Sequence, residues 1–153
     1  MNKQQLLGKI EKAWGSFNEA YAGLTEEQMV APGVTGEWSV KDILAHVTTW
    51  EEEALKTLPL ILRGERIPRY ADVYGGLDAF NALKSAEKCT LTLDETVRTL
   101  EATHEQLVAY VRDAPDEEIV RETRFRRRLR LDTYSHYPIH DEAIRTWRAE
   151  KGW

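Results

Sequence analysis

Apolar residues recur at steps of three and four over four long stretches of the chain, the pattern of amphipathic helices that each bury one face. These stretches cover residues 2–24, 39–62, 92–111 and 138–151. Ser39 and Thr92 are each followed three residues later by an acidic residue, which is the form of a capping box at a helix start. Pro138 suits the first turn of the last helix, whose inward residues include Ile139. The pattern therefore predicts an all-α protein with four long helices.

The segments between these helices are shorter and more mixed. Residues 77–88 predict a further helix, with Phe80 and Leu83 facing inward. Glycines and prolines punctuate residues 63–76, which predicts a long crossover loop. Arginines separate the apolar residues of segment 119–134, which predicts irregular or locally extended structure there.

Length and composition agree with one domain. The chain has 153 residues, 42% of them hydrophobic and 31% charged, as in a globular protein. The simplest architecture is then a single four-helix bundle over residues 1–153 with a long central connection. The lone cysteine, Cys89, excludes an internal disulfide, and the N-terminal residues lack the apolar core of a signal peptide. A cytoplasmic location is therefore expected.

The charge balance bears on the partners. The chain has 21 lysines and arginines against 26 aspartates and glutamates, a formal net charge of −5. This excess of negative charge argues against a general nucleic-acid binder, and no apolar run approaches the roughly 20 residues of a membrane span. Neither nucleic acid nor a membrane is therefore expected as a partner.

Residues 121–130 differ from the rest of the chain in the sign of their charge, because six arginines and one glutamate give them +5. Their arginines could form an anion-recognition rim or a solvated face that balances the acidic helices.

Three of the four histidines could share a metal ion. His136 and His140 are four residues apart, so a helix would place both imidazoles on one face, one turn apart. His46 lies at the edge of the apolar face of the second long helix, on the side of Trp50 and Glu53. Three imidazoles leave one position of a tetrahedral ion open, as in catalytic zinc sites. Surface histidine pairs at this spacing are also common, and His46 could instead be a boundary residue packed beside a tryptophan.

Further residues could contribute chemistry. His104 faces the core from the third long helix, where it could be a hydrogen-bonded core residue, a ligand or a proton carrier. Glu53 could act as a general base near the metal site, or it could belong to an exposed acidic face with Glu51 and Glu52. Four aromatic residues are expected at the mouth of the same cavity or in the packing around it: Trp38, Trp50, Tyr134 and Tyr137.

Segment 36–51, GEWSVKDILAHVTTWE, is followed far downstream by HYPIH at 136–140 and IRTWR at 144–148. Together these segments resemble the DinB/YfiT-like superfamily of four-helix proteins, and the ClbS/DfsB branch in particular. The N-terminal opening and the spacing of the helices also agree with that superfamily. The resemblance therefore covers nearly the whole chain.

The resemblance implies an up-up-down-down bundle in which His46, His136 and His140 hold a divalent metal ion, with zinc or nickel as first candidates. Superfamily members include thiol-dependent transferases and isomerases that use bacillithiol, mycothiol or glutathione. The ClbS branch includes a protein that inactivates a cyclopropane-containing genotoxin. A metal-dependent hydrolase or a thiol-dependent transferase is therefore expected, acting on a small toxic or electrophilic molecule, with Glu53 as the candidate catalytic base.

Other interpretations fit the same residues. Some ClbS-type proteins lack the three histidines, so the chain is either a metal-retaining relative or a member of a neighbouring branch. The alternative functions are a metal-free protein that binds or sequesters a small molecule, of the ClbS/DfsB type, and a dimeric scaffold whose histidines only cap the bundle. The expected partners are a small-molecule substrate, a low-molecular-weight thiol and, in a homodimer, a second copy of the chain.

Overall fold

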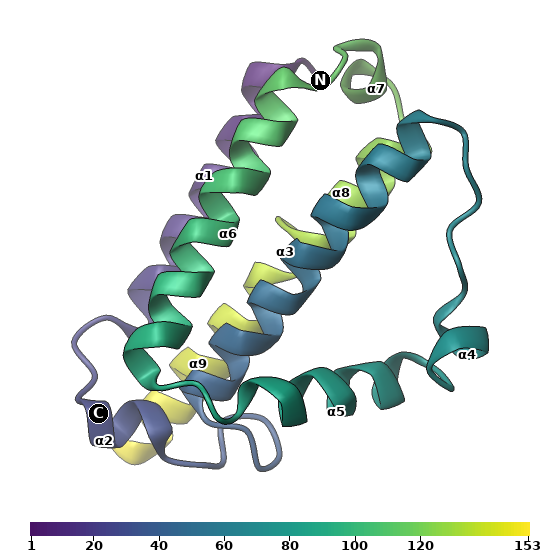
Figure 1. Cartoon of the computed structure of the whole chain (residues 1–153). Helices are drawn as coiled ribbons and strands as arrows, with labels where there is room; N and C mark the ends of the chain where they lie inside the picture. Colours follow the sequence, from purple (N-terminus) through teal and green to yellow (C-terminus); the bar gives the residue numbers. More distant parts are fainter.

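A computed structural model describes residues 1–153 and shows an almost entirely helical chain (Figure 1). The long helices are α1 (Lys3–Tyr21), α3 (Val40–Leu62), α6 (Leu93–Asp113) and α9 (Tyr137–Lys151). The shorter ones are α2 (Glu26–Val30), α4 (Tyr70–Val73), α5 (Leu77–Lys88), α7 (Glu117–Val120) and α8 (Arg124–Asp132). The only strand-like feature is an isolated bridge between Thr35 and Trp38. The predicted all-α fold is confirmed.

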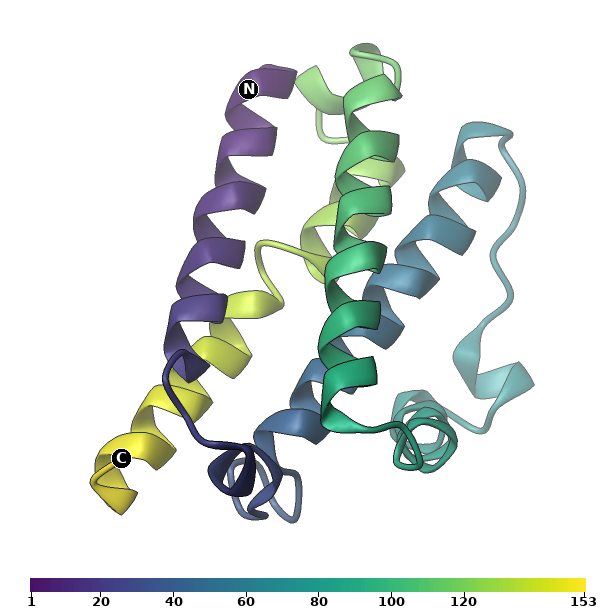
Figure 2. The ribbon, with the colours of Figure 1, turned by 60° about the vertical axis from the view of Figure 1, so that its left-hand side comes forward.

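The long helices form a bundle in which α3 packs against α6 and α8, and α1 packs against α9. Figures 1 and 2 show that α1 runs along the bundle in one direction, α3 and α6 run back, and α8 and α9 return. The connection from α1 to α3 stays at one end of the bundle, so these two helices are antiparallel. The directions thus differ from the up-up-down-down order that the resemblance implied. The expected long crossover is present, and it joins the parallel helices α3 and α6.

Polar side chains start the long helices where the sequence predicted. The hydroxyl of Ser39 accepts a hydrogen bond from the backbone N–H of Asp42, whose carboxylate accepts one from the backbone N–H of Ser39. Thr92 and Glu95 form the same reciprocal pair at the start of α6. Each pair satisfies backbone N–H groups that have no partner within the helix, and such a cap contributes about 1 kcal/mol. Pro59 lies inside α3 without ending it.

The crossover is anchored to α3 by aromatic packing. Phe80 of α5 is fully buried, and its ring centroid lies 5.2 Å from that of Trp50 and 5.0 Å from that of Tyr70. The indole N–H of Trp50 also donates to the side-chain oxygen of Asn81 at 3.0 Å. Leu83 was expected to face inward, but it is exposed, because Phe80 is the only residue that α5 buries. One buried residue, Phe80, therefore provides most of the apolar contact between α5 and the rest of the fold.

The prediction of irregular structure over residues 119–134 is wrong, because most of this segment forms α8. The hydroxyl of Thr123 accepts a backbone N–H of the first turn and so caps the helix. Phe125 and Leu129 are four residues apart and both fully buried, which is the spacing of a helix face. Arginines occupy the remaining faces and obscure this short apolar pattern in the sequence.

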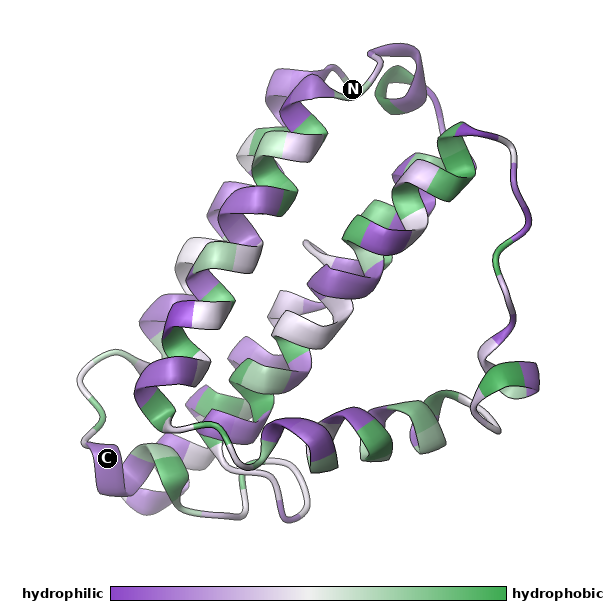
Figure 3. Ribbon diagram, in the orientation of Figure 1, coloured by the Kyte–Doolittle hydropathy of each residue, from purple (hydrophilic) through white to green (hydrophobic).

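The core lies between the long helices, and apolar residues recur at intervals along each of them (Figure 3). Ile139, expected to face inward, is 62% exposed. The reason is that α9 turns the line of His140, Ile144 and Trp147 toward the bundle instead. No helix combines the length and the apolar character that crossing a membrane would require.

Candidate metal centre

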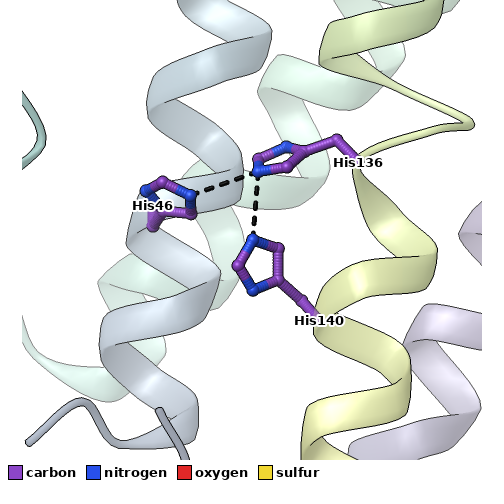
Figure 4. A group of neighbouring side chains, drawn as sticks. All are labelled: His46, His136 and His140. Carbon is purple, nitrogen blue, oxygen red and sulfur yellow. Dashed lines mark hydrogen bonds between the residues drawn. The ribbon is translucent and has the colours of Figure 1, made fainter. Parts of the chain in front are cut away.

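Three imidazoles meet in the bundle, one from α3 and two from the start of α9 and the residue before it (Figure 4). His46 lies in the second turn of α3, His136 immediately precedes α9, and His140 lies in the first turn of α9. The Nε2 atom of His136 is 3.1 Å from Nε2 of His46 and 3.0 Å from Nε2 of His140. Ligand atoms of all three residues lie within 4.8 Å of one another. The structure thus brings together the three histidines that the sequence singled out.

The junction between α8 and α9 explains how His136 comes to lie one helical turn from His140. Backbone N–H groups of His136 and Tyr137 both donate to the carbonyl of Thr133, at 2.8 and 2.9 Å. His136 has near-helical backbone angles, with φ −93° and ψ −48°. Pro138 therefore falls in the first turn of the helix, where a missing N–H removes no helical hydrogen bond. The one-turn spacing between His136 and His140 is preserved.

Burial keeps the three imidazoles uncharged. It lowers the pKa of His46 to about 3, and the nearby charges of His140 and Lys88 act in the same direction. Burial, followed by the other two imidazoles, lowers the pKa of His136 to about 3. Burial alone lowers the pKa of His140 to about 4. All three are neutral at pH 7, the form in which an imidazole binds a metal.

Two of the separations between imidazole nitrogens are close to those expected around a shared divalent ion. Zinc–nitrogen bonds of about 2.0–2.1 Å at tetrahedral angles place two nitrogens about 3.3 Å apart. The two Nε2 separations at His136 are close to this value. The Nδ1 atoms of His136 and His140 are buried without a partner. The hydrogen bond that usually orients a metal-binding imidazole is therefore missing, and packing must orient these two rings.

A pocket of about 310 Å³ opens onto His136. Its other lining residues are Trp50, Tyr70, Leu77, Arg128, Leu131 and Asp132. The Nε atom of Arg128 lies 2.6 Å from a carboxylate oxygen of Asp132, and Nη2 of Arg128 donates to the hydroxyl of Tyr70 at 2.9 Å. Burial raises the pKa of Asp132 to about 6, although Arg128 acts in the opposite direction. The pocket offers a small molecule an aromatic wall and one charged pair beside the imidazoles.

Glu53 does not belong to the histidine cluster. Its Oε1 atom accepts a hydrogen bond of 2.8 Å from the hydroxyl of Tyr70. The side chain lines a different, smaller pocket of about 100 Å³ with Lys56 and Tyr74. Tyr70 lines both pockets and so connects Glu53 to the cavity beside His136. The role of Glu53 as a general base stays a prediction.

Glu51 was expected with Glu52 on an exposed acidic face, but its side chain is fully buried. One carboxylate oxygen accepts hydrogen bonds from the Tyr137 hydroxyl at 2.5 Å and from Nδ1 of His104 at 2.9 Å. The prediction that His104 faces the core is confirmed. A signal for Glu51 was available, because it continues the inward positions of α3, which repeat in steps of four and three. These positions are Val40, Leu44, Val47, Ala54 and Leu58.

The four aromatic residues expected around one cavity separate into different environments. The ring centroid of Trp38 lies 4.8 Å from that of His46, and Trp50 lines the pocket beside the cluster. Tyr137 is fully buried. Tyr134 lines another pocket, formed with residues of α1. Only the two tryptophans therefore lie at the candidate site.

The arginine-rich segment mostly faces away from the cluster. Arg128 is the one arginine that lines the pocket beside His136. Three others approach the carboxylate of Glu122, at 2.8, 3.5 and 4.0 Å: Arg130, Arg126 and Arg127. Arg121 and Arg124 are exposed. The expected anion-recognition rim is reduced to Arg128 at the pocket, and the other arginines lie on α8 or, in the case of Arg121, directly after α7.

The lowered pKa values make the stability of the metal-free protein depend on pH. The three imidazoles take up protons near pH 6.5 in the unfolded chain but only near pH 3 to 4 in the folded one. Between these limits the unfolded state binds more protons, so stability falls as the pH is lowered. Each histidine is expected to remove about 2 kcal/mol between pH 7 and pH 5. Denaturant titration of chelator-treated protein at both pH values measures this loss, and equal unfolding free energies would contradict it.

Three neutral histidines lie together beside a pocket inside a helical bundle. This combination is that of a candidate metal-binding four-helix protein. The sequence pattern of the DinB superfamily matches residues 9–142, and the chain belongs to the DinB superfamily. No curated protein matches the sequence.

Solved structures share this fold over nearly their whole length. DfsB, described as a sibling lethal factor precursor, is 16% identical in sequence to this chain and superposes with a TM-score of 0.83. The superposition covers 99% of this chain and 97% of the DfsB chain. The colibactin self-resistance protein ClbS is 19% identical with a TM-score of 0.80, covering 95% and 94%. An uncharacterised protein from Escherichia coli UTI89 is 16% identical with a TM-score of 0.81, covering 99% and 95%. The resemblance to the DinB-like superfamily, with ClbS and DfsB among its structural neighbours, is confirmed.

One of these structures contradicts the expectation that nucleic acid is excluded as a partner. ClbS, which has this fold, was crystallised with double-stranded DNA. The expectation rested on the net charge of −5, but residues 121–130 carry +5 within one short segment. Contact with phosphates depends on such a local patch rather than on the charge of the whole chain.

Proposed function

We propose that this chain binds a divalent metal ion through His46, His136 and His140 and uses it to act on a small molecule. The convergence of three Nε2 atoms beside a pocket carries the proposal. Zinc and nickel are the first candidates, because neutral imidazoles suit both ions. Three protein ligands leave one position of a tetrahedral ion open, as in catalytic rather than structural zinc sites.

Such an ion, when bound, supplies Lewis acidity and brings the pKa of a water molecule or thiol near neutrality. The side chains around it would position the reactants. Trp50 and Tyr70 offer flat apolar surfaces in the pocket beside His136. Arg128 uses Nε for Asp132 and Nη2 for Tyr70, so its Nη1 group has no partner in the chain. A carboxylate on the substrate or on a thiol would bind there.

Two reaction classes fit this arrangement, hydrolysis of a small molecule and transfer of a low-molecular-weight thiol to an electrophile. Either reaction needs a group that takes up a proton. We assign this role to Glu53 acting through Tyr70, because the Tyr70 hydroxyl lines the pocket and donates to Glu53 at 2.8 Å. A proton from the pocket could therefore reach the carboxylate in two short steps.

Thiol transfer can be tested with a chromogenic electrophile, 1-chloro-2,4-dinitrobenzene, and two thiols that differ in carboxylate content. The zinc-loaded protein should accelerate the reaction of both glutathione and 2-mercaptoethanol, and chelation should remove the acceleration. Arg128→Met should raise KM for glutathione about tenfold, because the variant loses one charged hydrogen bond to a glutathione carboxylate. The same substitution should leave KM for 2-mercaptoethanol unchanged. Steady-state kinetics measure both values.

The same reagents separate the alternatives. An acceleration of p-nitrophenyl acetate hydrolysis without any thiol effect would assign the hydrolase. Binding of a small molecule that is equally tight before and after chelation, with neither reaction accelerated, would contradict metal-dependent catalysis and favour a sequestering protein of the ClbS/DfsB type.

A second candidate function is contact with nucleic acid through the exposed arginines of α8. Residues 121–130 carry +5, and a protein of this fold was crystallised with double-stranded DNA. Arg124 and Arg127 are exposed, so both guanidinium groups are accessible to phosphates.

Fluorescence anisotropy with a short DNA duplex tests this contact. Arg124→Glu combined with Arg127→Glu should weaken binding at low salt and reduce the salt dependence by about two phosphate contacts. Arg98→Glu, on the exposed face of α6, is the matched control and should have a much smaller effect. Equal affinities for all the variants would contradict a role of the α8 surface.

A further inference from the structure

A second pocket lies between α1 and α6, which are neighbours in the bundle (Figure 2). Its volume is about 460 Å³, within the range of small-molecule sites, and it shares no lining residue with the pocket beside His136. Its apolar lining consists of Leu7, Ile10, Trp14 and Val108. Its exposed charged residues are Glu11, Glu105 and Arg112, whose side chains form no ion pair within the chain. The charged side chains together carry −1.

His104 contributes the remaining polar group of this pocket, and its ring is held on two sides. One face stacks on Trp14, with ring centroids 3.6 Å apart and the planes at 4°. Nδ1 lies 2.9 Å from a carboxylate oxygen of Glu51, which also accepts a hydrogen bond from Tyr137. Because a carboxylate oxygen only accepts, the neutral tautomer of His104 that fits this contact carries its proton on Nδ1 and has Nε2 as an acceptor.

The Nε2 atom of His104 forms no hydrogen bond within the chain, and it is not among the buried atoms that lack a partner. The ring lines the pocket, and 10% of the side chain is exposed. An oriented imidazole with a free nitrogen in an apolar pocket is suited to accepting a hydrogen bond from a ligand.

We propose that the α1–α6 pocket is a second small-molecule site, distinct from the histidine cluster, and that Nε2 of His104 accepts a hydrogen bond from a ligand hydroxyl. The apolar lining fits an aromatic ligand body. The carboxylates of Glu11 and Glu105 outnumber the guanidinium of Arg112, which favours a positively charged substituent near the pocket opening. The ligand class is therefore a phenol whose ring carries an alkylammonium side chain.

Three related probes test each part of this assignment. Tyramine has the hydroxyl and the ammonium group, phenethylamine lacks the hydroxyl, and 3-(4-hydroxyphenyl)propionate reverses the charge. NMR titrations that follow the Trp14 indole and His104 ring signals measure their affinities. Tyramine should bind about tenfold more tightly than either of the other probes, because each lacks one polar interaction. Equal affinities of tyramine and phenethylamine, or unmoved Trp14 and His104 signals, would overturn the proposal.

Variants locate the site. His104→Phe keeps an aromatic ring on Trp14 but removes Nε2, so the preference for tyramine over phenethylamine should disappear. Glu11 is exposed, so Glu11→Gln should fold normally, and it should weaken tyramine binding without changing the preference for tyramine over phenethylamine.

His46→Ala should leave tyramine binding unchanged while removing a ligand of the proposed metal site. Loss of tyramine binding in His46→Ala would place the probe at the histidine cluster and refute a second site, and a preference retained in His104→Phe would refute the role of Nε2.

Discussion

Replacement of His136 by alanine is expected to abolish stoichiometric binding of zinc or nickel. The Nε2 atom of His136 is the one that the other two imidazoles approach, at 3.1 and 3.0 Å, so its loss leaves two ligands without their shared neighbour. An ion at a thousand times its dissociation constant stabilises a folded protein by about 4 kcal/mol, and the variant should lose this increment. Metal analysis of protein purified without a histidine tag, with thermal unfolding before and after chelation, measures the effect.

His104→Gln is the matched control, because it removes the one histidine that lies outside the cluster. This variant should retain one metal ion per chain even where its own stability is reduced. An unchanged metal content in His136→Ala, or wild-type protein that neither binds nor is stabilised by a divalent ion, would contradict the proposed metal centre.

Substitution of Glu51 by alanine should lower the free energy of unfolding by about 3–5 kcal/mol. The hydroxyl of Tyr137 and Nδ1 of His104 would both lose their acceptor at a fully buried position. Burial raises the pKa of Tyr137 well above its ordinary value, so the hydroxyl stays protonated and still needs an acceptor in the variant. In a chain of this length the loss corresponds to a fall of about 10 °C in Tm, which calorimetry measures.

Glu52 provides the control for this substitution, because it is the adjacent residue in α3 and its carboxylate is exposed, with an ion pair to Lys88. Glu52→Ala should change stability by no more than about 1 kcal/mol, as for other surface ion pairs. A loss from Glu51→Ala as small as that expected from Glu52→Ala would show that the Glu51 network contributes little to the fold.

Much of the fold follows from local patterns in the sequence. The starts of α3 and α6 are predictable because a capping box involves residues only three positions apart. The long helices are predictable because each buries a stripe of regular period. The same reasoning misses α8 because five of its nine residues are arginines, which conceal the four-residue spacing of its two buried apolar residues, Phe125 and Leu129. The inward positions predicted for Ile139 and Leu83 are wrong, because the orientation of a helix about its own axis depends on its neighbours in the fold.

The candidate site was partly predictable for a related reason. His136 and His140 form a local pair, whereas the position of His46 beside them depends on contact between α3 and α9, which the family resemblance supplied. Glu51 was overlooked because a carboxylate is normally exposed, although its register along α3 placed it inward. The partners of this carboxylate, Tyr137 and His104, come from two other helices and cannot be inferred from spacing along one helix.

The placement of His46 in α3 and of His136 directly before α9 has a consequence for how the bundle comes apart. The two residues are 90 positions apart in the sequence, and a chain with a single cysteine has no internal disulfide to tie such distant segments together. An ion held by both would be a reversible tie between α3 and α9. The helices could not separate without releasing it, so the lifetime of the folded chain would depend on the concentration of free metal around it.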